Sequence, residues 1–177
     1  MAKAQGGAYP ILFLTLVVLV SVVALTLIDG VTRDRIAEAQ RDEVQEMLAT
    51  LFPEMAAYEI DDDTGIYTIL VGGAPAGHAL MSKATGYGGP IDILVGLEPD
   101  RSLRGIRIIS QAETPGLGAK IIDAAFLEQF AGLTLDDLAL RKHGGSVDAI
   151  TGATISTSAV IEGVRQGILD LDSEGGG

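Results

Sequence analysis

Cysteine is absent from the 177-residue sequence, and positively charged residues are scarce. Without cysteine the chain cannot form disulfides, thiol nucleophiles, cysteine-linked lipid anchors, or cysteine-ligated zinc and iron–sulfur sites. The 12 Lys and Arg residues stand against 24 Asp and Glu residues, which gives a formal net charge of −12. Because a surface of that charge repels a polyanion, we expect no nucleic-acid partner.

Charged residues are missing altogether from one long apolar run, residues 11–28. A helix of this length spans ~27 Å, close to the hydrocarbon thickness of a bilayer. A chain that crosses lipid must satisfy its backbone hydrogen bonds internally, so the run should be helical. A cleaved signal peptide is the alternative, but its apolar stretch is usually shorter, and residues 24–26 make a poor cleavage site. We therefore predict one uncleaved transmembrane helix.

The rest of the chain divides into a short N-terminal arm, a helical connector, one domain and a tail. The connector is an amphipathic pattern that stops at Pro53, and the tail is expected to be disordered. The boundaries of these parts are 1–10, 29–53, 54–171 and 172–177. Within the domain, strand-like runs separated by Gly and Pro turns come first, and helical patterns follow. The predicted strands are 65–71, 77–83, 91–97 and 103–110, and the predicted helices are 121–130 and 156–171. This order indicates an α+β domain.

The most informative stretch, residues 148–158, combines small residues with several hydroxyl side chains and precedes the last predicted helix. Small residues let the backbone approach a ligand, and a helix N-terminus offers unpaired N–H groups and a partial positive charge to a phosphate. Ser and Thr are also common helix N-caps. The residues by themselves therefore leave two interpretations open, a phosphate site and a capped helix.

Asp148-x-x-Thr151-Gly152-Ala153-Thr154 resembles the flavinylation motif of bacterial FMN-binding domains. In that family a flavin transferase moves FMN from FAD onto the last threonine of the motif as a phosphoester, and Thr154 is the matching position here. The resemblance implies that Gly152 and Ala153 leave room for the transferase and the phosphate. It also implies that Asp148 orients the acceptor, or the metal-bound donor, during transfer.

A second segment, residues 113–118, reads Glu-Thr-Pro-Gly-Leu-Gly and accompanies the threonine motif in these domains. Taken alone it is a Pro-Gly turn. The resemblance implies that its glycines let the backbone approach the isoalloxazine ring, that its leucine packs on the ring face, and that its Glu and Thr hydrogen-bond the polar edge of the ring. The residues with these implied roles are Glu113, Thr114, Gly116, Leu117 and Gly118.

Two neighbours of this segment matter for the same site. Lys120 is a candidate partner for the flavin phosphate, although an ordinary surface lysine is an equal alternative. Many relatives carry a histidine two positions before the Glu, where this chain has Gln111. The replacement argues against an imidazole that titrates near the flavin.

A third segment, residues 85–91, contains a Gly-Tyr-Gly-Gly loop. It does not fit the GxGxxG dinucleotide pattern, because the spacing is wrong and no helix follows. The loop is similar to that of the G subunit of the Rnf complex. The related C subunit of the sodium-pumping NADH:quinone oxidoreductase differs there and is usually longer.

This resemblance implies a membrane-anchored electron-transfer subunit with covalent FMN, within an ion-translocating ferredoxin:NAD⁺ oxidoreductase. Its partners would be the other membrane subunits and, during maturation, a flavin transferase; we expect no substrate turnover of its own. The alternatives are the C subunit of the sodium pump, a cofactor-free membrane-anchored scaffold in which Thr154 is only a helix cap, and a stand-alone flavoprotein reductase.

The resemblance also places the domain on the extracytoplasmic side of the cell membrane. The flanking charges favour the opposite orientation, because Arg33, Arg35 and Arg41 follow the apolar run and only Lys3 precedes it. The positive-inside rule weakens for long translocated domains. We therefore follow the resemblance.

The sequence offers little for metal binding or hydrolysis. An EF-hand that began at Asp61 would need Glu where Gly72 stands, so Asp61-Asp62-Asp63 is expected to be a solvated turn. His78 and His143 lack metal-ligand spacing. No Ser-His-Asp set or pair of catalytic carboxylates stands out.

Overall fold

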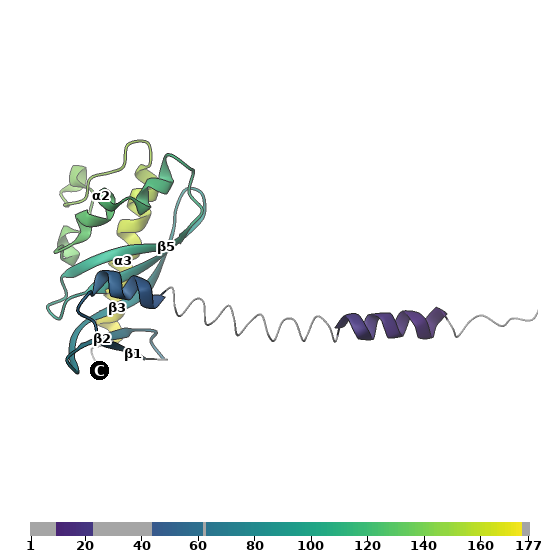
Figure 1. The fold of residues 1–177 in the computed structure, drawn as a ribbon. Coiled ribbons are helices and arrows are strands. Elements are labelled where there is room, and N and C mark those ends of the chain that lie inside the picture. The colour runs from purple at the N-terminus through teal and green to yellow at the C-terminus, as the bar shows by residue number, and fades with distance from the viewer. Residues whose placement is uncertain (1–9, 23–43, 62, 175–177) are drawn as a thin grey trace, which may run out of the picture. The chain divides into compact units, whose positions relative to one another are not determined.

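The computed structural model describes the whole chain except residues 1–9, 23–43, 62 and 175–177 (Figure 1). The chain divides into two compact units, Met1–Gln45 and Glu46–Gly177. In the first unit, residues 10–22 are helical, and their large apolar side chains are exposed. This helix covers part of the predicted run 11–28, whose last six residues lie outside the described part. Among the described residues, no helix is both long enough and apolar enough to cross a membrane.

The second unit is built on a five-stranded antiparallel sheet whose strands follow one another in chain order (Figure 1). The strands are β1 Ala57–Ile60, β2 Tyr67–Val71, β3 Ala74–Thr85, β4 Pro90–Leu97 and β5 Leu103–Gln111. Four of them match the predicted strands, and the antiparallel sheet with helices confirms the predicted α+β class. The edge strand β1 is short and mostly exposed, so its sequence carried no clear alternation.

A short helix precedes β1, and a turn joins β1 to β2. Asp61 sits between β1 and β2, where its carboxylate accepts the Asp63 N–H at 3.0 Å and makes the turn that the sequence predicted. Residues 44–51 are helical and end just before Pro53, as the connector prediction required. The connector's residues 29–43 lie outside the described part of the chain. Residues 46–53 belong to the same compact unit as the strands.

The segment after β5 is a chain of short turns rather than one helix. The predicted helix 121–130 is wrong as a continuous element, because Asp123 adopts an extended conformation with φ −68° and ψ 139° and divides it. The observed pieces are one short α-helix, α2 Ala124–Leu127, and four 3₁₀ helices: η1 Gly118–Ile122, η2 Glu128–Phe130, η3 Leu135–Asp137 and η4 Arg141–His143. These pieces bury Phe126 and Phe130, which meet edge to face with ring centroids 5.4 Å apart.

The long helix α3, Thr154–Glu174, ends the described chain and packs on one face of the sheet (Figure 1). It begins two residues before the predicted start and continues through residue 174, so residues 172–174 of the predicted disordered tail are helical. Alternate residues of β4 face it and are fully buried, as are its own residues at i, i+4 spacing. These core residues are Ile91, Ile93, Val95, Leu97, Val160 and Val164.

Small residues allow α3 to lie close to the sheet. A Cβ added at Gly163 would come within 2.9 Å of Ile93 Cδ1, and one added at Gly167 within 2.7 Å of Leu80 Cδ1. On the other face of the sheet, Leu48 and Phe52 are fully buried. The sheet is thus covered on both faces, and α3 is held so closely that the position of its N-terminus is fixed.

Candidate cofactor pocket

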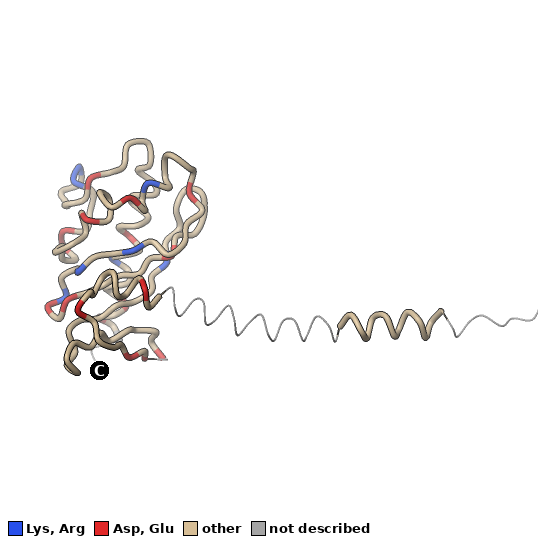
Figure 2. Tube along the Cα trace, in the orientation of Figure 1, with Lys and Arg blue, Asp and Glu red and all other residues tan. Residues whose placement is uncertain are grey.

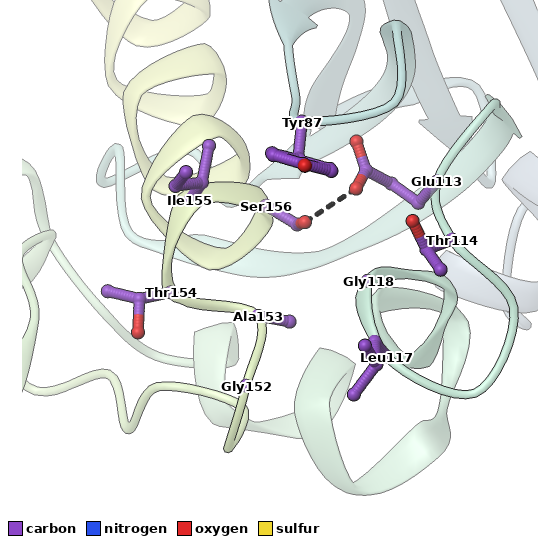
Figure 3. Close-up of a pocket in the computed structure, with 10 residues that line it drawn as sticks. All are labelled: Tyr87, Glu113, Thr114, Leu117, Gly118, Gly152, Ala153, Thr154, Ile155 and Ser156. Carbon is purple, nitrogen blue, oxygen red and sulfur yellow. Dashed lines mark hydrogen bonds between the residues drawn. The ribbon is translucent and has the colours of Figure 1, made fainter.

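A cavity of about 460 Å³ lies at the N-terminus of α3 (Figure 3). Three segments distant in sequence form its wall: the loop before β4, the loop after β5, and the first turn of α3 with the residues before it. Its lining residues are Tyr87, Glu113, Thr114, Leu117, Gly118, Gly152, Ala153, Thr154, Ile155 and Ser156. Seven of these are among the predicted site residues, so the structure brings the two predicted motifs together around one cavity.

The first turn of α3 explains the order of residues in the threonine motif. Gly152 has φ +78°, a left-handed conformation that suits glycine, and a Cβ there would also come within 3.2 Å of Leu117 Cδ2. The Ala153 carbonyl accepts the Thr157 N–H at 3.0 Å, which makes Ala153 the N-cap residue. The Thr157 hydroxyl donates to the same carbonyl at 3.0 Å and accepts the Ile150 N–H at 3.2 Å. The turn is therefore fixed without help from Thr154.

Thr154 is the first residue of α3, and its side chain is exposed. Its hydroxyl makes no hydrogen bond to any residue that the structure describes. In Figure 3 it lies on one side of the first helical turn, whereas Ser156 points to the other side. The helix-cap interpretation of Thr154 is wrong, because Ala153 holds the cap position. A free hydroxyl at a cavity wall is what an acceptor of a phosphoryl group requires.

Glu113 joins the three segments of the wall. Its side chain is 6% exposed, and its Oε2 accepts the Ser156 hydroxyl at 2.6 Å (Figure 3). Its Oε1 accepts the Gly88 N–H at 3.0 Å. The Glu113 N–H donates to Gln111 Oε1 at 2.6 Å, so Gln111 orients this loop. The contact with Ser156 connects residues 43 positions apart in the sequence.

Three lining residues were not among the predicted site residues. Tyr87 is 72% exposed and stands over the cavity from the glycine loop (Figure 3). Ile155 is 57% exposed and adds apolar surface next to Thr154. Ser156 is buried through its bond to Glu113. The glycine loop could have indicated that Tyr87 lies at the site. Nothing in the sequence linked Ser156 to Glu113.

Four predicted site residues do not line the cavity. Thr151, Gly116 and Lys120 are exposed outside it, and Gly116 has φ +76° with open space around it, which fits a turn. Asp148 is also outside, where its carboxylate accepts Arg141 Nε at 2.7 Å and Arg141 Nη2 at 3.2 Å. These hydrogen bonds and the adjacent negative charge raise the pKa of Arg141. The pair is exposed to solvent, so Asp148 is accessible to a second protein.

The cavity presents a distinct electrostatic pattern. None of its ten lining residues is basic, and Glu113 is its one charged side chain. Figure 2 shows acidic residues spread over several elements of the domain rather than gathered at one point. Attraction of a phosphate therefore depends on the N–H groups and partial positive charge at the start of α3, on the side of the turn away from Glu113.

These residues fit FMN in size and chemistry. Ligand pockets range over about 300–1,000 Å³ and are mainly apolar with a few polar groups. Leu117, Ile155 and the ring of Tyr87 supply apolar surface for a flat aromatic ring system, and Thr114 supplies a hydroxyl at its edge. The start of α3 suits the phosphate. Within the described residues, no group of His, Asp and Glu side chains is arranged to hold a metal ion.

Comparison with known proteins agrees with this geometry. The family model of the FMN-binding domain matches residues 86–169, a range that contains all three segments of the wall. The G subunit of the ion-translocating oxidoreductase complex of Methanosarcina acetivorans is 35% identical over 140 residues, which cover 75% of this chain and 74% of that protein. The G subunit of the same complex in Stutzerimonas stutzeri is 31% identical over 180 residues, covering 91% and 79% respectively. The chain belongs to this G-subunit family.

Solved structures share the fold of this G-subunit family member. The C subunit of the Na⁺-translocating NADH-quinone reductase from Parabacteroides distasonis aligns with a TM-score of 0.52 at 24% identity, over 60% of each chain. NqrC from Shewanella oneidensis aligns with a TM-score of 0.51 at 18% identity, over 68% of this chain and 72% of that one. At these identities the likeness concerns the fold. The FMN-binding domain and the G-subunit family confirm the resemblance drawn from the sequence.

Proposed function

We propose that this chain is the electron-transfer subunit of an ion-translocating ferredoxin:NAD⁺ oxidoreductase complex, and that it carries FMN covalently on Thr154. The observation that supports this most directly is the free, exposed hydroxyl of Thr154 at the start of α3, beside a cavity formed by both family motifs. Membership of the G-subunit family supports the complex, and the FMN-binding domain supports the cofactor.

Attachment is a phosphoryl transfer in which FAD is the donor. Thr154 Oγ1 would attack the phosphorus of the FMN half, the bond between that phosphorus and the bridging oxygen would break, and AMP would leave. The hydroxyl proton would pass to a base of the transferase. The α3 N–H groups would bind the phosphate, and Gly152 and Ala153 keep the approach open because they lack large side chains. Asp148 is exposed and would contact the transferase rather than the flavin.

Once bound, FMN would exchange one or two electrons and so link one-electron iron–sulfur centres to two-electron nicotinamide chemistry. The chain's own residues would position the cofactor. Leu117 and Tyr87 would pack against the ring system, Thr114 would hydrogen-bond its edge, and the covalent bond would prevent its loss. Gly116, Gly118, Thr151 and Lys120 would act through the shape of the two loops, since they add no polar side chain to the cavity.

We further propose that residues 11–28 anchor the domain in the membrane, with the domain on the extracytoplasmic side. The described part of this run exposes apolar side chains along its whole length, from Ile11 at 67% to Val22 at 56%. Such a surface is stable in lipid and costly in water. The anchor would keep the flavin at high effective concentration near the other membrane subunits.

The attachment site is tested by co-expressing the full chain with a flavin transferase and measuring intact mass and flavin fluorescence in a denaturing gel. Wild type should carry one FMN through denaturation, and Thr154→Ala should carry none. Ser158→Ala is the matched control, because it removes another exposed hydroxyl of the same helix that does not line the cavity, and it should be loaded like wild type. Unmodified wild type, with a transferase that modifies a known substrate, would favour the cofactor-free scaffold.

The orientation can be tested with introduced cysteines, because the chain has none. A cysteine at exposed Ala131 should react with a membrane-impermeant maleimide in intact spheroplasts. A cysteine at Lys3, in the N-terminal arm, should react only after permeabilisation. The reverse labelling pattern would place the domain in the cytoplasm.

A further inference from the structure

Glu113 is a buried charge without a cationic partner. It is 6% exposed, and both carboxylate oxygens accept hydrogen bonds from donors, the Ser156 hydroxyl and the Gly88 N–H. Both oxygens of the carboxylate therefore act as acceptors. No Lys, Arg or His side chain of the described residues forms an ion pair with it.

The backbone around this carboxylate is shaped to hold it. A Cβ added at Gly86 would overlap Glu113 Oε1, and one added at Gly118 would overlap Oε2 and lie 2.7 Å from Ser156 Oγ. Because Gly86 and Gly118 have no side chains, the carboxylate fits into the narrow space between their two loops. Its location at the cavity wall is therefore fixed on both sides.

Such a charge is costly. Moving an ionised carboxylate out of water costs several kcal/mol unless hydrogen bonds and opposite charges offset the loss. Two hydrogen bonds and the nearby N-terminus of α3 offset part of it. A neutral glutamine could make comparable contacts with Gly88 and Ser156 at a lower cost in solvation. The hydrogen bonds that connect the two loops therefore do not by themselves explain why residue 113 is a glutamate and not a glutamine.

We propose that the Glu113 carboxylate is a positioning residue that sets both the direction and the reduction potential of the bound flavin. This inference rests on the proposed function. A negative charge on this wall repels the phosphate and directs it to the Thr154 side of the α3 turn, so the ring system lies toward Glu113, Tyr87 and Leu117. The same charge opposes negative charge gained by the ring on reduction. It therefore lowers the midpoint potential.

The test is a spectroelectrochemical titration of the full chain loaded with FMN, reduced with dithionite and reoxidised with ferricyanide in the presence of mediators. Glu113→Gln keeps the size of the side chain and removes the charge, so its midpoint potential should be more positive than that of wild type. Glu162→Gln is the matched control, because it makes the same change of net charge at an exposed position on α3 outside the cavity. Its potential should equal that of wild type. Ser156→Ala keeps the Glu113 charge and should shift the potential less than Glu113→Gln.

The outcomes separate this inference from the proposed function. FMN-loaded Glu113→Gln with the potential of wild type would overturn the inference and leave Thr154 as the attachment site. An equal shift in Glu162→Gln would overturn it as well, by showing an effect of overall charge. Folded Glu113→Gln that carries no FMN would place Glu113 in attachment and overturn its role in the potential. Wild type that carries no FMN after co-expression would overturn both proposals.

Discussion

The hydroxyl of Ser82 on β3 donates a hydrogen bond of 2.6 Å to the Gly163 carbonyl in the middle of α3. The bond is buried and joins residues 81 positions apart in the sequence. It lies where a glycine allows the helix to approach the sheet, and it fixes the height of α3 over β3. The position of Thr154 at the start of the same helix depends on this packing of α3 against β3.

Gly163→Ala should destabilise the domain, although alanine is the better helix former by about 1 kcal/mol. The added Cβ would come within 2.9 Å of Ile93 Cδ1 and 3.0 Å of Ala84 Cβ. Overpacking of this kind costs about 1–3 kcal/mol, so a net loss of about 0–2 kcal/mol is expected by urea unfolding. Ser158→Ala, on the exposed face of the same helix, should be neutral or slightly stabilising. An equal increase in the free energy of unfolding of both variants would show that α3 is not packed tightly against the sheet.

Arg104 should stabilise the segment that precedes the sheet. Its guanidinium lies 5.1 Å from the Phe52 ring centroid, its Nε donates to the Leu51 carbonyl at 2.9 Å, and it pairs with Glu54 and Glu98. Lysine cannot reproduce this planar set of contacts. Arg104→Lys should therefore lower the free energy of unfolding by about 1–2 kcal/mol. Arg107→Lys, on the same strand but without an ion pair to an acid among the described residues, is the control and should have a smaller effect.

Stability should fall as the pH is lowered through about 6.5, and His78 should be responsible. Burial, followed by the nearby charge of Arg101, lowers the pKa of His78 below its ordinary value of 6.5. The unfolded chain therefore binds a proton at a higher pH than the folded chain. The stability that neutral His78 contributes to the folded state is fully present above pH 6.5, and it is lost as the pH falls toward the pKa of His78 in the folded chain. The unfolding free energy of His78→Gln should lack this slope, whereas that of His143→Gln, at an exposed turn, should keep it.

Asp148 and Arg141 should contribute unequally to flavin attachment. Their ion pair is exposed, and solvent-exposed ion pairs contribute little to the stability of a fold. Arg141→Gln should therefore leave the domain folded and the initial rate of attachment close to that of wild type. Asp148→Asn should lower the rate, because it removes the carboxylate that we expect the transferase to contact. Equal loss in both variants would indicate instead that the ion pair orders the loop before α3.

The sequence predicted the central strands within a few residues, because β3 and β4 are mainly apolar runs, much of which is buried, and they end at glycine or proline turns. It missed β1, which is exposed at the sheet edge, and it joined η1, α2 and η2, since apolar spacing alone does not reveal the extended Asp123. For the site, the two motifs pointed to Leu117 and Thr154, and the structure places both at the wall of one cavity. The contact between Glu113 and Ser156 could not be predicted, because it depends on where α3 meets the sheet.

The order of the strands has a consequence for how the molecule is made. Each strand pairs with its neighbour in the sequence, so the sheet can form while the chain is still being synthesised. The pocket cannot form then, because α3 is the last described element, and its first turn with the two residues before it supplies half of the lining residues. A flavin on Thr154 would therefore mark only molecules in which α3 has been synthesised and has packed on the sheet. Attachment would then be selective for folded chains, and only those chains would take part in electron transfer.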